Sequence, residues 1–142
     1  MPLPSPEPGL VVHYEFLWSN ENEAGQTDGE KQRPAVIVVA TKIDGNKTEV
    51  IVAPITHSPP RGAGIAIEIP PKVKTHLGLD NQRSWVTLDE LNEFVWPGYD
   101  LYPVPNTPPG TFAYGYLPPV LFIQIRDRIL ALDAALKSLI QR

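Results

Sequence analysis

The chain has 142 residues, three histidines and no cysteine, which excludes disulfides and thiolate metal sites. Its net charge of −4 argues against general nucleic-acid affinity, and no apolar run reaches the roughly 18 residues that a membrane-spanning helix needs. An apolar content of 42% predicts one globular domain over residues 1–142. The N-terminus lacks the basic and apolar regions of a signal peptide, so we expect a cytoplasmic protein. We also expect no membrane contact and no cofactor.

Charge is unevenly distributed along the chain. Residues 1–30 hold six acidic residues and no lysine or arginine, whereas residues 31–83 hold eight basic and four acidic residues. The second segment therefore favours a local basic surface within an acidic protein. Ordinary mixed surface charge is the alternative interpretation.

The first thirty residues predict an arm, a strand and a loop. Residues 1–8 are rich in proline, which is typical of an extended arm with little order. Residues 9–18 alternate loosely between apolar and polar side chains and predict a strand. Residues 19–32 are polar, contain glycine and show no apolar periodicity, so we expect a long loop. Loops of that length are often functional or mobile.

Residues 33–56, RPAVIVVATKIDGNKTEVIVAPIT, predict a β-hairpin. Two runs of β-branched residues flank Asp44-Gly45, a dipeptide typical of two-residue hairpin turns. Continuous apolar runs indicate strands that are covered on both faces, so this hairpin should lie centrally. Proline cannot donate to a strand ladder, and Pro34 therefore marks the first residue of its strand. Arg33 and Thr56 flank the open end of the hairpin and are expected to lie close in space.

The C-terminal half predicts short strands and two helices. Pro70-Pro71 and Gly78 bracket a short helix, since proline fits a first helical position and glycine fits a helix stop. The other expected elements are a loop at 57–64, a strand at 65–69, strands at 85–88 and 94–96 separated by polar residues 89–92, and a strand at 111–116.

One apolar stripe predicts a long C-terminal helix from Val120 to Ile140. Its members step by three or four residues, as one face of a helix does, and they are Leu121, Ile125, Ile129, Leu132, Leu136 and Leu139. Many short strands with one terminal helix favour a mainly β domain, a compact barrel on which the helix packs.

Several of these sequence words resemble one family. Arg-Pro-Ala-Val-Ile-Val, then Pro-Ile-Thr at the end of the next strand, is similar to the MazF/PemK/Kid family of toxin ribonucleases. The words Leu-Gly-Leu, Ser-Trp-Val and Asn-Glu-Phe-Val-Trp-Pro-Gly extend the resemblance to a longer PemK-like subgroup, over roughly residues 9–135. The resemblance implies a small SH3-like barrel (CcdB/PemK-like), a homodimer and an antitoxin protein as partner. It also implies metal-independent, sequence-selective cleavage of single-stranded messenger RNA through a cyclic phosphate.

The resemblance also implies the catalytic residues. Arg33 matches the family arginine at the scissile phosphate, and a guanidinium suits that role because it binds phosphate oxygens with two donors. Thr56 matches a threonine that hydrogen-bonds there, and Asp89 matches a family aspartate. His57 follows Thr56 directly and belongs to a residue type that titrates near neutrality. We expect RNA contacts from the neighbouring polar and basic residues Lys31, Ser58, Arg61 and Arg83.

The sequence also departs from the family. Kid-like members place an arginine two residues before the aspartate, where this chain has Thr87. Arg83 is the candidate substitute. A catalytically inactive binding protein on the same fold therefore remains the alternative, and a purely structural domain is a third. Each candidate has a structural alternative as well: Arg33 as a strand-edge cap, Thr56 as a β-branched strand residue, and His57 as a solvated loop residue.

Overall fold

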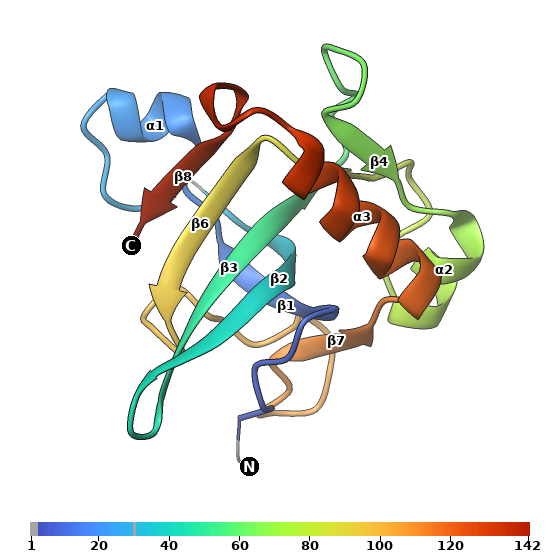
Figure 1. Ribbon diagram of the computed structural model, residues 1–142. Helices are drawn as coiled ribbons and strands as arrows, with labels where there is room; N and C mark the ends of the chain where they lie inside the picture. Colours follow the sequence, from blue (N-terminus) through green and yellow to red (C-terminus); the bar gives the residue numbers. More distant parts are fainter. Residues whose placement is uncertain (1–2, 30) are drawn as a thin grey trace.

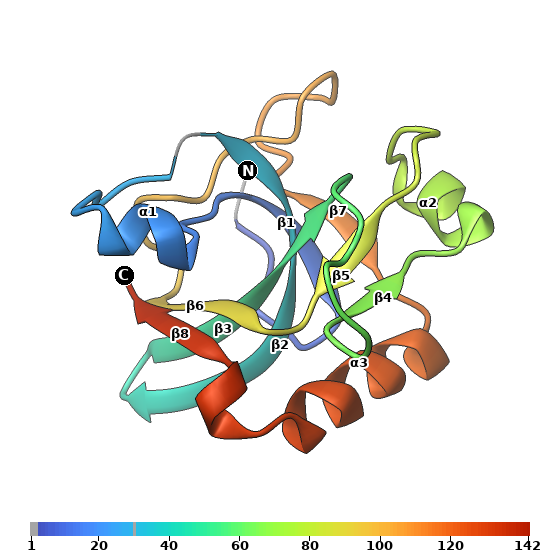
Figure 2. The ribbon, with the colours of Figure 1, turned by 90° about the horizontal axis from the view of Figure 1, so that it is seen from above.

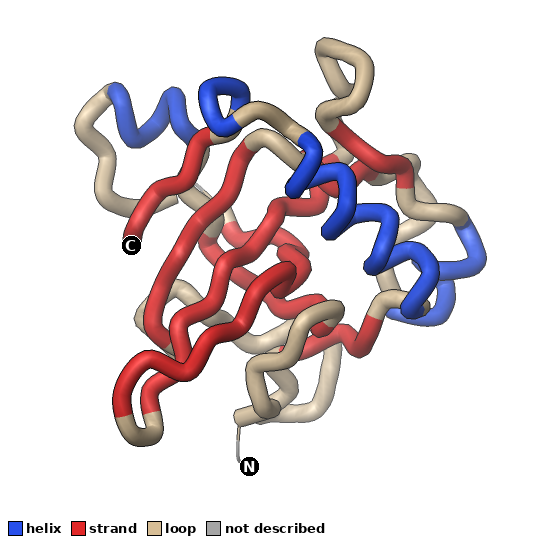
Figure 3. Tube along the Cα trace, viewed as in Figure 1, coloured by secondary structure: helices blue, strands red, loops and turns tan. Residues whose placement is uncertain are grey.

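The computed structural model describes residues 3–29 and 31–142 and is mainly β, with strands at the centre and helices at the periphery (Figures 1 and 3). This confirms the mainly β part of the predicted fold class. Residues 3–8, within the predicted arm, form no helix or strand, and residues 1–2 lie outside the described residues. None of the described helices is long and apolar enough to cross a bilayer.

The predicted central hairpin is confirmed. It consists of β2 (Gln32–Asp44) and β3 (Lys47–Thr56), which pair antiparallel over nearly their whole length. The turn is one residue later than expected, because Asp44 pairs with Lys47 and Gly45 opens the turn. Gly45 adopts a φ of 52°, which glycine reaches without steric penalty.

The sheet grows outward from this hairpin (Figure 2). On one side β1 (Leu10–Glu15) pairs with β2 and then with β7 (Ala113–Tyr116). On the other side β3 pairs with β6 (Glu90–Val95) along its first half and with β5 (Trp85–Thr87) at its end. β4 (Ala66–Glu68) then pairs with β5.

The strand order does not close into a complete barrel. Among the described residues, β4 and β7 end the path β4-β5-β3-β2-β1-β7 and do not pair with each other. β3 nevertheless belongs to two ladders that diverge, because β6 and β5 pair with different halves of it. The open end of the hairpin therefore lies where the sheet divides.

Two predictions for polar segments are wrong. The expected loop at 19–32 contains a short helix, α1 (Ser19–Glu23), and the expected break at 89–92 is the start of β6. Both errors have a tertiary cause, since Ser19 donates two hydrogen bonds to Glu90, at 2.8 and 2.6 Å. Asn92, fully buried in β6, exchanges hydrogen bonds with the backbone N–H and carbonyl of Leu17. Buried polar groups are tolerated when they are paired in this way.

The short helix bracketed by proline and glycine is confirmed. α2 (Pro71–Leu77) has proline at its first position and ends at Gly78, which has a left-handed φ of 71°. In this helix the side chain of Lys74 is buried, and Leu77 belongs to the hydrophobic core.

The long C-terminal helix is shorter than predicted. α3 (Pro119–Ala131) ends nine residues before the expected limit and is followed by a 3₁₀ turn (Ala134–Leu136), whose Ala135 N–H donates to the Asp133 carboxylate. β8 (Ser138–Gln141) then pairs parallel with β6. Leu136 and Leu139, which continue the helical stripe in the sequence, are exposed. The unpaired backbone of β6 offers this segment ladder hydrogen bonds that the helix pattern could not reveal.

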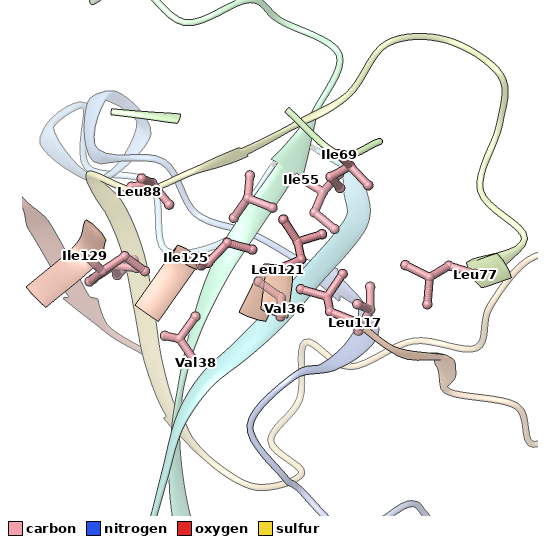
Figure 4. Close-up of a cluster of buried hydrophobic side chains, with 14 residues drawn as sticks. Val36, Val38, Ile55, Ile69, Leu77, Leu88, Leu117, Leu121, Ile125 and Ile129 are labelled. Carbon is pink, nitrogen blue, oxygen red and sulfur yellow. The ribbon is translucent and has the colours of Figure 1, made fainter. Parts of the chain in front are cut away.

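α3 covers one face of the central hairpin. Leu121, Ile125 and Ile129 form its buried stripe, and Figure 4 shows them over Val36 and Val38 of β2. A second core cluster, rich in aromatic residues, fills the other side of the sheet around Tyr14, Phe16 and Phe94. Packing on both faces explains the continuous apolar runs of the hairpin.

A buried arginine holds the segments beside the second cluster together. The side chain of Arg142 is 4% exposed and lies 3.2 Å from the carboxylate of Asp100. It also donates to Asn92 Oδ1 at 3.0 Å and to the carbonyl of Glu15 at 2.9 Å. Its guanidinium carbon lies 5.7 Å from the ring centroid of Tyr14. We call these residues the Arg142 network.

Candidate functional site

A cleft of about 810 Å³ opens beside the open end of the hairpin. Its walls come from α1 and the residue before it, the start of β2, the end of β3 with the loop that follows, and the turn between β5 and β6. Seven of the eight residues singled out in the sequence line it: Lys31, Arg33, Thr56, His57, Ser58, Arg61 and Asp89.

Arg33 enters the cleft from the first residues of β2. Its guanidinium carbon lies 5.0 Å from the ring centroid of Trp18, which is a cation–π contact. Its Nε is buried and has no hydrogen-bond partner among the described residues. Burial lowers the pKa of Arg33 from its ordinary value, and the negative charge of Glu21 opposes that shift. A buried donor without an acceptor is unfavourable, and an anion is an acceptor that a guanidinium would bind strongly.

Thr56 lies at the end of β3, opposite the start of β2. The ladder pairs Ala35 with Pro54, so continued register places Arg33 and Thr56 across from each other. Thr56 Oγ1 accepts a hydrogen bond of 3.1 Å from the Ser58 N–H. The hydroxyl proton then remains for a ligand, because a hydroxyl both donates and accepts.

His57 belongs to a chain of polar side chains that reaches into the interior. Its Nε2 lies 2.7 Å from Asp80 Oδ2, and both side chains are about half exposed. Lys74 Nζ lies 2.8 Å from Asp80 Oδ1 and also donates to the carbonyl of Gln82. Burial raises the pKa of Asp80, but hydrogen bonds from Lys74 and Gln82 and the charge of His57 outweigh it and hold this pKa below its ordinary value.

Thr87, the last residue of β5, and Asp89, in the turn between β5 and β6, both line the cleft. Burial raises the pKa of Asp89 above its ordinary value, although a backbone hydrogen bond opposes this. A carboxylate with a raised pKa is a stronger proton acceptor than an ordinary aspartate. Thr87 supplies a neutral side chain at the position where the resemblance to Kid-like members predicts an arginine.

The cleft wall formed by α1 is held by hydrogen bonds at the start of the helix. Glu90 accepts the two hydrogen bonds from Ser19, and Glu21 accepts one of 3.0 Å from the Trp18 N–H. Trp18, Glu21 and Glu90 all line the cleft. Sequence reasoning missed these residues, because nothing local indicates that α1 contacts β6.

Arg83 is the predicted residue that the structure does not bring to the cleft. It forms a two-pronged pair with Glu68, at 2.9 and 2.8 Å, and its guanidinium carbon lies 5.0 Å from the ring centroid of Trp85. The guanidinium is therefore already occupied. Arg83 consequently does not replace the arginine that Thr87 lacks.

Sequence reasoning also missed Asp80, Lys74 and a cluster of three acidic residues elsewhere. Asp80 and Lys74 flank the end of α2 and gave no signal beyond their charge. Glu15, Asp28 and Asp100 place carboxylate oxygens within 4.8 Å of one another, beside the Arg142 network and outside the cleft. Arg142 supplies a counter-charge there, since it is paired with Asp100.

The family of this chain comes from comparison with known proteins. No curated protein matches the chain. Residues 13–94, more than half of the chain, match the family described as PemK-like, MazF-like toxin of type II toxin-antitoxin system. The match includes the second half of β1, the hairpin and most of β6, and so it includes the residues that line the cleft. The chain therefore belongs to the family of PemK-like, MazF-like toxins of type II toxin–antitoxin systems.

Proposed function

We propose that this toxin is a metal-independent, sequence-selective endoribonuclease that cleaves single-stranded messenger RNA. The observation that carries the proposal is that Arg33, Thr56, His57 and Asp89 line one cleft. Cleavage without a metal needs a base for the 2′-hydroxyl, an acid for the leaving 5′-oxygen, and a cation beside the phosphorane. The cleft offers a candidate for each role.

Arg33 and Thr56 are assigned to the phosphate. Arg33 has a buried Nε without a partner among the residues described, and a phosphate oxygen would supply one. Thr56 keeps a hydroxyl proton for a second oxygen, as its own acceptor contact is to the Ser58 N–H. Asp89 is assigned as the base because its pKa is raised. Lys31, Ser58 and Arg61 are assigned to the RNA backbone on either side.

The partners and assembly complete this proposal. We propose a cytoplasmic homodimer that a cognate antitoxin neutralises by competing with RNA beside α1. Exposed apolar side chains such as Val120, Leu130 and Leu136 support an association surface. The SH3-like barrel type is proposed as well, in an incompletely closed form, since β3 passes between two ladders.

The experiment uses purified protein, freed of any antitoxin, with a long mixed-sequence RNA in EDTA. We expect cutting at a short recurrent sequence, products that end in a cyclic phosphate, and no cutting of a strand with deoxyribose at the mapped site. Arg33→Ala should remove most of the activity, whereas Arg126→Ala, an exposed arginine on α3, should retain it. Equal cutting by the Arg33 and Arg126 variants would contradict the assignment of Arg33.

A second candidate function is RNA or protein binding without catalysis. It is favoured by one observation. Thr87 stands where Kid-like members have an arginine, and Arg83, the candidate substitute, is paired with Glu68. On this alternative the wild type binds RNA in a filter assay and cuts none of it.

A further inference from the structure

We propose that Lys74 and Asp80 position His57 to donate a proton to the leaving 5′-oxygen during RNA cleavage. The inference rests on the proposed function, because it assigns the acid of that reaction. It also assigns work to two residues, Lys74 and Asp80, that are not part of any sequence word shared with the family.

The three side chains form a chain of contacts that is buried at Lys74 and reaches the cleft at His57. Lys74 is 5% exposed on α2, and its ammonium contacts Asp80 Oδ1 and the carbonyl of Gln82. The Gln82 N–H donates to the same carboxylate oxygen at 3.1 Å. The second oxygen of Asp80 faces His57 Nε2 at 2.7 Å. One oxygen is therefore held from the interior while the other contacts the imidazole.

This arrangement differs from an ordinary surface ion pair. Exposed pairs contribute little, because both long side chains lose conformational freedom when they meet. Here the carboxylate is already held by a buried ammonium and a backbone N–H, so only the histidine needs to be ordered. A histidine oriented by a carboxylate is a recurrent device for proton transfer.

The position of His57 in the chain places it beside the phosphate site. It directly follows Thr56, and both residues line the cleft with Arg33. Asp80 contacts Nε2, which leaves Nδ1 as the ring nitrogen for the substrate. A protonated His57 forms an ion pair with Asp80 and carries the proton that an acid must deliver.

The reaction balances with these residues. The 2′-oxygen attacks phosphorus, and its proton passes to the Asp89 carboxylate. The bond from phosphorus to the 5′-oxygen breaks, and that oxygen takes a proton from His57. The products are a 2′,3′-cyclic phosphate and a 5′-hydroxyl. Water later exchanges the protons that Asp89 gained and His57 lost.

The test compares two RNA oligonucleotides that contain the mapped cut site and differ in one atom. In one the leaving 5′ atom is oxygen, and in the other it is sulfur, which leaves without protonation. His57→Ala should lower the rate on the oxygen substrate by about a hundredfold or more, the usual effect of losing a general acid. On the sulfur substrate its rate should stay within about threefold of the wild type.

Asp80→Asn should show the same pattern, with a loss on the oxygen substrate no larger than that of His57→Ala and little loss on the sulfur substrate, because the histidine remains but is less well oriented. His76→Ala and Asp127→Asn are matched controls on exposed parts of α2 and α3, and they should cut both substrates normally. Arg33→Ala should be slow on both substrates, because phosphate stabilisation does not depend on the leaving atom. Circular dichroism and thermal melting establish that each variant is folded.

Equal losses on oxygen and sulfur for folded His57→Ala would overturn the assignment of His57 as the acid. A selective loss for His57→Ala without one for Asp80→Asn would overturn the positioning role of Asp80. A wild type that cuts neither substrate would instead refute the proposed function itself, so the two failures are distinguishable.

Discussion

Two polar networks of this fold differ in where they end: one stays in the interior and the other reaches the cleft. The Arg142 network is almost fully buried, whereas the chain from Lys74 through Asp80 to His57 starts in the interior and ends in the cleft. Burial raises the pKa of Asp100 in the first network, although the charge of Arg142 opposes this. In the second, hydrogen bonds and charge overcome burial and lower the pKa of Asp80.

This difference suggests a structural role for the Arg142 network and a chemical role for the chain that ends at His57. Both terminal nitrogens of Arg142 have partners within the protein, so these contacts break when β1, β6 and β8 separate. The other network leaves one imidazole nitrogen for a ligand. A buried charge that is completely paired is a structural feature, and a paired charge that ends half exposed in a cleft is a candidate for chemistry.

The largest expected effect breaks the first network. Arg142→Met removes the charge that faces Asp100 and the donor to Asn92 and to the Glu15 carbonyl. Breaking a buried pair on one side costs about 3–5 kcal/mol of unfolding free energy. Urea denaturation should measure this loss, and Arg126→Met at an exposed pair should change stability by less than about 1 kcal/mol. Similar values for the two variants would show that burial does not distinguish the networks.

The next effect concerns the cleft. Arg33→Ala should lower turnover by about a hundredfold or more, since one preorganised donor to a developing charge is typically worth that much. Arg33→Lys should recover only part of it, because an ammonium lacks the planar fork. Single-turnover cleavage measures both variants, and full recovery by lysine would refute a two-donor contact. Thermal stability should change little, in contrast to Arg142→Met.

A smaller effect is expected at Thr56. Thr56→Val keeps the branched shape at the end of β3 and removes one neutral hydrogen bond, worth about 1 kcal/mol or roughly fivefold in rate. The same single-turnover assay measures it. Thr48→Val, in the same strand and outside the cleft, is the matched control and should cut at the wild-type rate.

The smallest effect is on stability against pH. The pKa of Asp80 lies below the ordinary value of 3.8 in the folded protein, so its carboxylate stabilises the fold above that pH. This contribution disappears as the pH falls through the lowered pKa. The difference in unfolding free energy between wild type and Asp80→Asn should therefore shrink between about pH 5 and pH 2. Because the side chain is half exposed, we expect less than about 1 kcal/mol in total. A constant difference across this range would refute the linkage.

The parts of the fold that the sequence predicts are those with local causes. The hairpin follows from β-branched runs around a glycine turn, and α2 follows from Pro71 and Gly78. The failures have nonlocal causes. Residues 138–141 carry an apolar period that fits a helix, yet the open edge of β6 pairs with them instead. α1 forms in a polar segment because Glu90, 71 residues away, binds Ser19.

The candidate site divides in the same way. Arg33 and Thr56 were predicted together because any antiparallel hairpin brings its two ends together. Asp80 could not be predicted, because its contact with His57 depends on how α2 is placed against the cleft. Arg83 is next to this segment in the sequence, but its pairing with Glu68 directs it elsewhere.

The parallel ladder between β6 and β8 has a consequence for the order of folding. The hairpin forms from neighbouring residues, whereas β6 acquires its outer strand only from residues 138–141, and β1 acquires β7 from residues 113–116. Contacts between such distant segments require long loops to close and therefore form late. A nascent chain thus exposes an incomplete sheet with an unpaired edge until residues 138–141 have been synthesised, so the cleft wall around Glu90 is completed only after those residues are available.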